Sequence, residues 1–145
     1  MDERLYKIMK RHLKYNEEEL KLFKERKENR DILEKIGAIK NMEIVVEIIS
    51  AKGCNTGHEK GQKFYFDGAG NLISKKLPGK CCIFLLGNLS SHIFAIHELV
   101  YAGINPADIK LRFPRIGCGD VGVKNCGWGK VIVETSVITK SKQIR

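Results

Sequence analysis

Five cysteines in a chain of 145 residues are the side chains with the greatest capacity for chemistry in this sequence. Four of them come at the end of an expected helix or strand or in a glycine-rich loop: Cys54, Cys82, Cys118 and Cys126. Thiolates are soft metal ligands, and loops that leave strands at the same edge of a sheet come together in a compact domain. We therefore predict that these four thiols surround one metal centre.

An iron–sulfur cluster is the first expectation for this centre, and zinc is the alternative. The segment "GCGDVGVKNCGWG" (117–129) places five glycines beside two cysteines, and its backbone N–H groups can point at cluster sulfides and tune their potential. Zinc has no such use for glycine. The cysteine spacing contains none of the short knuckles of zinc and ferredoxin motifs, so the prediction depends on placement alone. The expected role is redox or accessory to a larger enzyme.

Two further side chains, His58 and Asp120, are candidate catalytic or supporting residues of the same site. His58 is a candidate ligand, general base or ordinary polar loop residue. Asp120 can hydrogen-bond its own turn or hold His58. A metal-free interpretation stays open, in which Cys54 and His58 supply nucleophilic or proton-transfer chemistry in an enzyme that binds a small molecule.

Three residues of the late loop are candidates for contact with a cofactor or ligand, namely Gly117, Gly119 and Trp128. The Trp128 side chain can stack on a ligand ring or plug the edge of the core. At the start of the long apolar segment, either Cys81 or Cys82 can face the site, and the other is then a small core residue.

The charge and the termini restrict the class of protein. The net charge of +9 is spread along the chain without a basic cluster, which favours a soluble basic surface over a nucleic-acid interface. The N-terminus lacks the apolar core of a signal peptide, and no run of eighteen apolar residues predicts a membrane span. We therefore expect a cytoplasmic protein without membrane contact, in which the thiols stay reduced and disulfides do not form.

The order of predicted elements indicates an α+β fold. Residues 1–41 form an N-terminal helical segment that packs on the body or mediates a homo-oligomer or a larger complex. Residues 42–139 form the α+β core domain, and residues 140–145 a loose tail. The core domain is expected to combine a mainly antiparallel sheet with one long buried helix. Its elements are strands at 42–51, 109–116 and 130–138, a hairpin around 67–71 and the helix within 81–103.

The segment "GCNTGHEKGQKFYF" (53–66) resembles a C-x3-H-x2-G-x3-F signature. The residues that carry it here are Cys54, His58, Gly61 and Phe64. A cysteine that opens a helix (Cys82) and a late Cys-Gly-Asp segment (118–120) follow in the same order. On these residues the chain, from about 43 to 138, resembles a family of small uncharacterised prokaryotic proteins that are frequent in anaerobes.

The resemblance implies a shared fold unit and a shared cysteine and histidine site, without a reaction or substrate. An anaerobic host would also make an oxygen-sensitive cluster easier to accept. The late segment of the family more often reads Cys-Pro-Asp, whereas this chain has Gly119 in place of the proline and Cys126 as an additional cysteine.

Overall fold

The computed structural model describes residues 3–140, which divide into two compact units, 3–36 and 37–140. The first unit contains the helices α1 (Glu3–Leu13), α2 (Glu17–Glu25) and α3 (Lys27–Glu34). The second contains all of α4 (Ile36–Lys40) except its first residue, and it contains the sheet. Most of the predicted C-terminal tail, residues 141–145, lies outside the described residues.

The first unit has a small core of its own, made of Tyr6, Leu20 and Leu33. Its second helix begins with a complete capping box, as the sequence predicts: the Asn16 side chain accepts the Glu19 backbone N–H at 2.8 Å, and the Glu19 carboxylate accepts the Asn16 N–H at 2.9 Å. Two of the unpaired N–H groups at the helix start are satisfied in this way.

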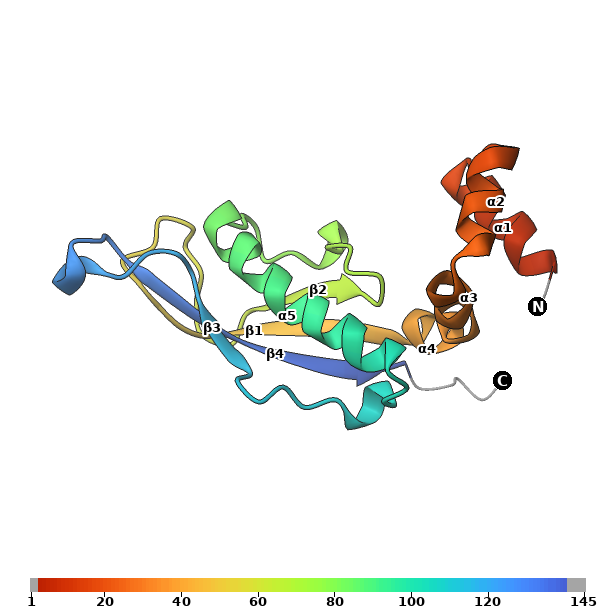
Figure 1. Ribbon diagram of the computed structural model, residues 1–145. Coiled ribbons are helices and arrows are strands. Elements are labelled where there is room, and N and C mark those ends of the chain that lie inside the picture. Colours follow the sequence, from red (N-terminus) through yellow and green to blue (C-terminus); the bar gives the residue numbers. More distant parts are fainter. Residues whose placement is uncertain (1–2, 141–145) are drawn as a thin grey trace. The chain divides into compact units, whose positions relative to one another are not determined.

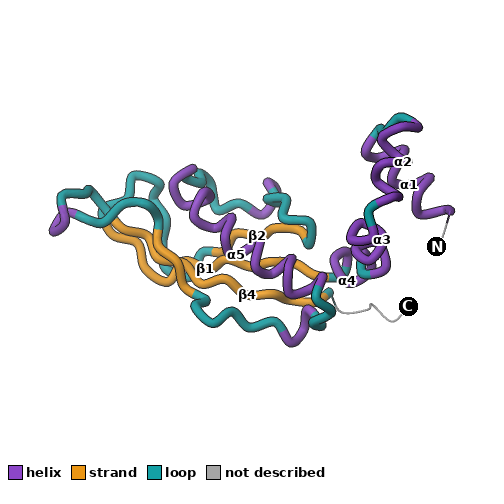
Figure 2. The backbone as a smooth tube through the Cα atoms, viewed as in Figure 1, coloured by secondary structure: helices purple, strands orange, loops and turns teal. Residues whose placement is uncertain are grey.

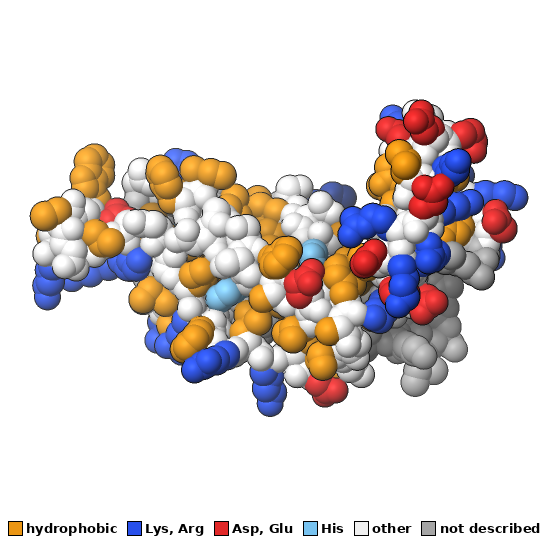
Figure 3. All heavy atoms as spheres, in the orientation of Figure 1, with side chains coloured by type: hydrophobic (Ala, Val, Ile, Leu, Met, Phe, Trp, Pro, Cys, Tyr) orange, Lys and Arg blue, Asp and Glu red, His pale blue; other side chains and the backbone are white. Residues whose placement is uncertain are grey.

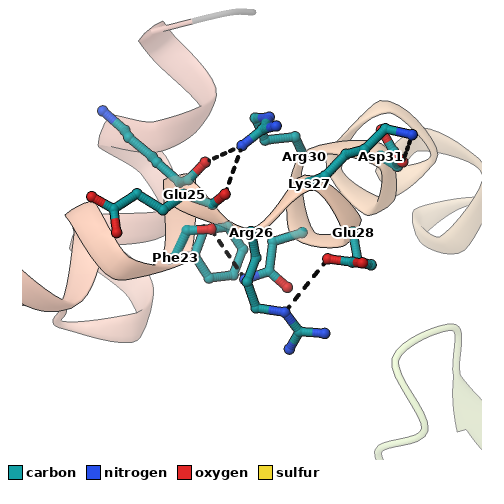
Figure 4. A network of polar contacts seen from close by, with 9 residues as sticks. Phe23, Glu25, Arg26, Lys27, Glu28, Arg30 and Asp31 are labelled. Carbon is teal, nitrogen blue, oxygen red and sulfur yellow. Dashed lines mark hydrogen bonds and ion pairs between the residues drawn. The ribbon is translucent and has the colours of Figure 1, made fainter.

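The junction between α2 and α3 is held by side chains that bond to the last carbonyls of α2 (Figure 4). The Arg30 guanidinium donates to the Lys24 and Glu25 carbonyls at 2.6 and 3.1 Å, and the Asn29 amide donates to the Phe23 carbonyl at 3.1 Å. These bonds satisfy carbonyls that a helix end leaves without a partner. The third helix begins at Lys27, directly after the N-cap residue Arg26.

The second unit is a four-stranded antiparallel sheet with one long helix across it (Figure 1). The strands are β1 (Met42–Lys52), β2 (Lys63–Asp67), β3 (Arg115–Gly117) and β4 (Lys130–Thr139), in the order β2-β1-β4-β3. The helix is α5 (Ile83–Tyr101). The α+β class and the antiparallel sheet predicted from the sequence are confirmed.

The core lies between one face of the sheet and one side of α5. On β1, the alternate side chains of Met42, Ile44, Val46 and Ile48 are fully buried, as the two-residue period of a strand requires. They form one hydrophobic cluster with Val131 and Val133 of β4 and with four residues of α5, namely Leu85, Leu89, Ile96 and Val100.

The prediction that the long helix is buried is wrong. Only 22% of the helix is buried, and Ile83, Phe84 and Phe94 are 67–70% exposed. Two histidines fix its inner side: His92 Nδ1 lies 2.8 Å from the Thr135 hydroxyl of β4, and His97 Nε2 lies 2.8 Å from the Gly68 carbonyl. A single helix on a sheet buries only the side that faces the strands, so apolar residues on its outer side stay in water.

Among the described residues, α5 is long and apolar enough to cross a membrane, by length and composition only. This is weak evidence, because the core helix of a soluble protein passes the same test.

Two predicted strands are shorter than expected. In the 109–116 segment only Arg115–Gly117 pairs with β4, after Pro114, which has no N–H to donate. The predicted return strand of the hairpin is reduced to a single bridge between Phe66 and Leu72.

Two substitutions two positions apart on α5 should show that only one side of this helix packs. We expect Ile96→Ala, at a fully buried position, to lower the free energy of unfolding by about 2–5 kcal/mol. Phe94→Ala removes a side chain that is 67% exposed and should change it by about 0.5 kcal/mol or less. Urea unfolding curves measure both, and equal losses would contradict the one-sided packing.

Candidate functional site

A cavity of about 240 Å³ opens where β1 ends, β4 begins and α5 starts. Three thiols from three separate segments line it: Cys54, Cys82 and Cys118. His58 and Trp128 also line this cavity. Figure 2 shows the loops of this end in teal, beyond the strand ends.

The Cys54 and Cys118 thiols are fixed by different local contacts. Cys54 follows β1, and its sulfur lies 3.1 Å from the Thr56 hydroxyl. Cys118 follows β3, and its sulfur accepts the backbone N–H of Val131 at 3.4 Å. The backbone N–H of Cys118 in turn donates to the Val131 carbonyl at 2.9 Å. Both sulfurs therefore sit at strand ends that the sheet itself holds in place.

Cys82 is the N-cap residue of α5, which confirms the predicted helix start. Its side chain makes no capping bond. Cys82, Phe84 and Leu85 line the cavity, so the cavity borders the N-terminus of this helix, where the backbone dipole favours negative charge. The adjacent Cys81 instead packs against the core. Burial, and secondarily the neighbouring Cys82, raise the pKa of the Cys81 thiol. The structure therefore turns Cys82 toward the site and keeps Cys81 as a small core residue.

His58 carries the polar atom that most clearly lacks a partner in this site. Its side chain is 8% exposed, and Nε2 has no hydrogen-bond partner among the described residues. The ring stands edge-on to Phe64, with 5.1 Å between the centroids. Burial lowers the pKa of His58, and a hydrogen bond with the Gln62 side chain opposes this only in part. A buried nitrogen without a partner costs stability unless something binds it.

Asp120 holds its own loop and does not contact His58. Its carboxylate accepts the backbone N–H groups of Gly122, Trp128 and Gly129 at 2.9–3.0 Å. These bonds, with that from Gly129 the strongest, lower the pKa of Asp120. Of the two roles that the sequence left open, the structure supports the turn.

The glycine-dense segment brings two chain segments into backbone contact. A Cβ added at Gly129 would overlap the Gly53 backbone, and one added at Gly53 would lie 2.8 Å from the Trp128 carbonyl oxygen. At Gly127 an added Cβ would collide with the Asp120 carboxylate. We call this contact between residue 53 and residues 128–129 the glycine seam. It places Cys54 beside the residues that follow the late loop.

The remaining predicted residues lie apart from the cavity lining. Cys126 is exposed, has a left-handed backbone (φ 68°) and does not line the cavity. Gly117 and Gly119 are not part of the lining either, although the Gly117 carbonyl accepts a hydrogen bond from Asn88 at 2.9 Å. Across residues 3–140, no three His, Cys, Asp or Glu side chains are already grouped as a metal site.

Sequence reasoning missed Lys130, which lines the cavity. Its ammonium donates to the Cys118 carbonyl at 2.8 Å, which places a positive charge near the thiols. The sequence around Lys130 does not predict this contact with Cys118, because the pairing of β3 with β4 brings the two residues together.

No family model, curated protein or solved structure matches this chain. The likeness to the C-x3-H-x2-G-x3-F family therefore stays a prediction.

The glycine seam predicts a sharp difference between two glycines of the same loop. Gly129→Ala should lower the melting temperature and make the Cys54 thiol react faster with a thiol reagent, because the added methyl group forces the two segments apart. Gly119→Ala is the matched control, since its Cβ would lie 3.9 Å from the nearest atom, in Phe84. Thermal unfolding and reagent kinetics measure both effects; tolerance of the alanine at 129 would contradict the seam.

The buried His58 predicts that stability falls in mild acid. The unfolded imidazole titrates near pH 6.5, whereas the folded pKa is lower, so the unfolded state binds more protons in the interval between them. Stability should be complete above about pH 6.5 and decline as the pH falls from there toward the folded pKa. Urea unfolding across this range should show a weaker pH dependence in His58→Gln. Some dependence should remain, because burial lowers the pKa of His92 as well.

Proposed function

We propose that the cavity binds a soft divalent metal ion, zinc in the first instance, through Cys54, Cys82, Cys118 and His58. The observation that carries this proposal is the convergence of three thiols, from three segments, on a cavity that also contains a buried imidazole nitrogen without a partner. A bound cation would satisfy that nitrogen, and neutral imidazole is the form that binds metals.

The donor set fits a single ion better than a cluster. Three cysteines and one histidine are a standard set for tetrahedral zinc. Iron–sulfur clusters usually take four cysteine thiolates, but neither Cys126 nor Cys81 lines this cavity. The iron–sulfur centre, with its redox or accessory role, stays a prediction that the donor count does not favour.

The electrostatic surroundings suit an anionic metal site. Three thiolates and a divalent ion leave one negative charge in excess. The N-terminus of α5 at Cys82 and the Lys130 ammonium near Cys118 both favour negative charge at this position. The surroundings would therefore offset the charge that the thiolates bring.

Metal binding would have to draw the ligands together, because they are not already grouped as a metal site. Cys54 and His58 share the loop after β1, in which Gly53, Gly57 and Gly61 have positive φ angles. Metal binding and local folding are commonly coupled in this way. We therefore propose that the ion orders this loop against α5.

A second candidate function follows from the size of the cavity. A volume of about 240 Å³ approaches that of small-molecule pockets. In this alternative the site binds a small molecule without metal, and Cys54 or His58 acts on it.

Cobalt titration of the reduced, metal-free protein tests the proposal. We expect one Co²⁺ per chain, with a sulfur-to-cobalt charge-transfer band, and displacement of cobalt by zinc. Cys54→Ser, Cys82→Ser, Cys118→Ser and His58→Gln should each weaken binding at least tenfold, in line with the loss of a ligand. The Cys126→Ser and Cys81→Ser variants are matched controls and should bind like the parent protein.

The outcomes separate the candidates. Absence of the cobalt band would contradict the metal site and leave the small-molecule candidate. A visible iron chromophore after anaerobic purification that is lost in Cys126→Ser would instead support the cluster. A rise in melting temperature with zinc in the parent protein, absent in Cys118→Ser, would support the ion.

A further inference from the structure

The loop between β3 and β4 exposes apolar side chains to water. Val121, Val123 and Trp128 are 55%, 75% and 84% exposed. Figure 3 shows hydrophobic side chains gathered at the end of the sheet unit where this loop lies, with lysine and arginine side chains next to them. We call residues 121–128 the loop tip. The exposure of these indole and valine side chains to water is unfavourable, and their burial would lower the free energy.

The loop tip borders a basic hollow. A depression of about 570 Å³ is lined by Lys52, Lys124 and Lys130 together with Val123 and Trp128, and no acidic residue contributes to its lining. Lys130 donates to the Cys118 carbonyl, whereas Lys52 and Lys124 form no ion pair in the part of the chain that the structure describes. The nearby Asp120 carboxylate already accepts three backbone N–H groups. The hollow therefore carries positive charge, and its Lys52 and Lys124 side chains can pair with an anionic partner.

The tip is held in shape before it meets any partner. The Asp120 carboxylate bonds to backbone on both sides of it, at Gly122 and at Trp128–Gly129. A short 3-10 turn, Val123–Asn125, occupies its middle. Little conformational entropy would be lost when such a tip docks.

We propose that the loop tip docks on the surface of an anionic lipid bilayer. The Trp128 indole would lie at the level of the headgroups, where tryptophan is enriched. Val121 and Val123 would enter the boundary of the acyl chains, and Lys52 and Lys124 would contact lipid phosphates. Lysines near an anionic bilayer are each attracted by the surface potential. This binding would be peripheral and would not involve insertion of α5.

The composition of the tip favours a bilayer over the other macromolecules. A single-stranded nucleic acid stacks successive bases on several aromatic rings, whereas this chain has one tryptophan and places valines beside it. The cores of protein interfaces are depleted of lysine, whereas here Lys124 of the tip and two lysines at the adjoining strand ends line one hollow together with Val123 and Trp128. A lipid surface accepts both kinds of side chain, at different depths.

The proposal does not depend on the metal site, because its principal residues are not proposed ligands. Four residues border both the thiol cavity and the hollow, namely Gly53, Trp128, Gly129 and Lys130. The test therefore leaves these four residues unchanged and alters Val123 and Lys124.

Vesicle binding of the full chain tests the inference, with the single tryptophan as reporter. With vesicles of phosphatidylcholine and phosphatidylglycerol we expect co-sedimentation and a blue shift of the tryptophan emission, neither of which pure phosphatidylcholine should give. Lys124→Glu should weaken binding by roughly fivefold for each unit of charge changed, and added salt should do the same. Val123→Ser should reduce the blue shift and the bound fraction.

Phe94→Ser is the matched control, because it removes an apolar side chain of similar exposure from α5, a helix with no lysine or arginine. It should leave vesicle binding unchanged. Equal binding to neutral and anionic vesicles, or full binding by Lys124→Glu, would overturn the proposal. Quenching of the tryptophan by a single-stranded oligonucleotide, without vesicle binding, would overturn it in favour of nucleic acid.

Discussion

The close contact between the backbone at residue 53 and the backbone at 128–129 is the constraint on which the rest of the site depends. Strand pairing brings Lys52 opposite Lys130, and the chain continues past this pair on both sides. Side chains at Gly53 and Gly129 would block that continuation. The Asp120 carboxylate holds the late side of the contact through three backbone N–H bonds. A single acidic side chain, which itself lines the cavity, thereby holds the loop that forms one cavity wall.

This contact explains how residues far apart in the chain come to share one cavity. Cys54 directly follows one side of it, and Cys118 is tied to the other through its paired bonds with Val131. The N-terminus of α5 supplies Cys82, because Leu85 and Leu89 fix the first turns of the helix on the sheet. The His58 imidazole is buried at the same place without a partner for Nε2. A proposed cation would join these groups, and the positive surroundings would balance the charge of their thiolates.

The same loop has an inner and an outer side with different chemistry. Its inner side, through Cys118, Trp128 and Gly129, lines the thiol cavity. Its outer side presents Val123 and an almost fully exposed indole beside basic residues. The three hydrogen bonds to Asp120 stabilise both sides together. The same bonds therefore hold the loop tip in shape and position the cavity wall. The exposed outer side of α5 is a separate apolar surface.

The sequence by itself determined the local structure. The capping box at Asn16, the helix that starts at Cys82 and the β-branched strand β1 all follow from residues close in the chain, so they were predictable. Tertiary structure decided the rest, because it depends on strand pairing and layer count. It joined three of the four predicted thiols and left Cys126 in solvent. It placed the Asp120 carboxylate against three backbone N–H groups of its own loop. It also left one side of α5 exposed to water, because a single sheet covers only the side of a helix that faces it.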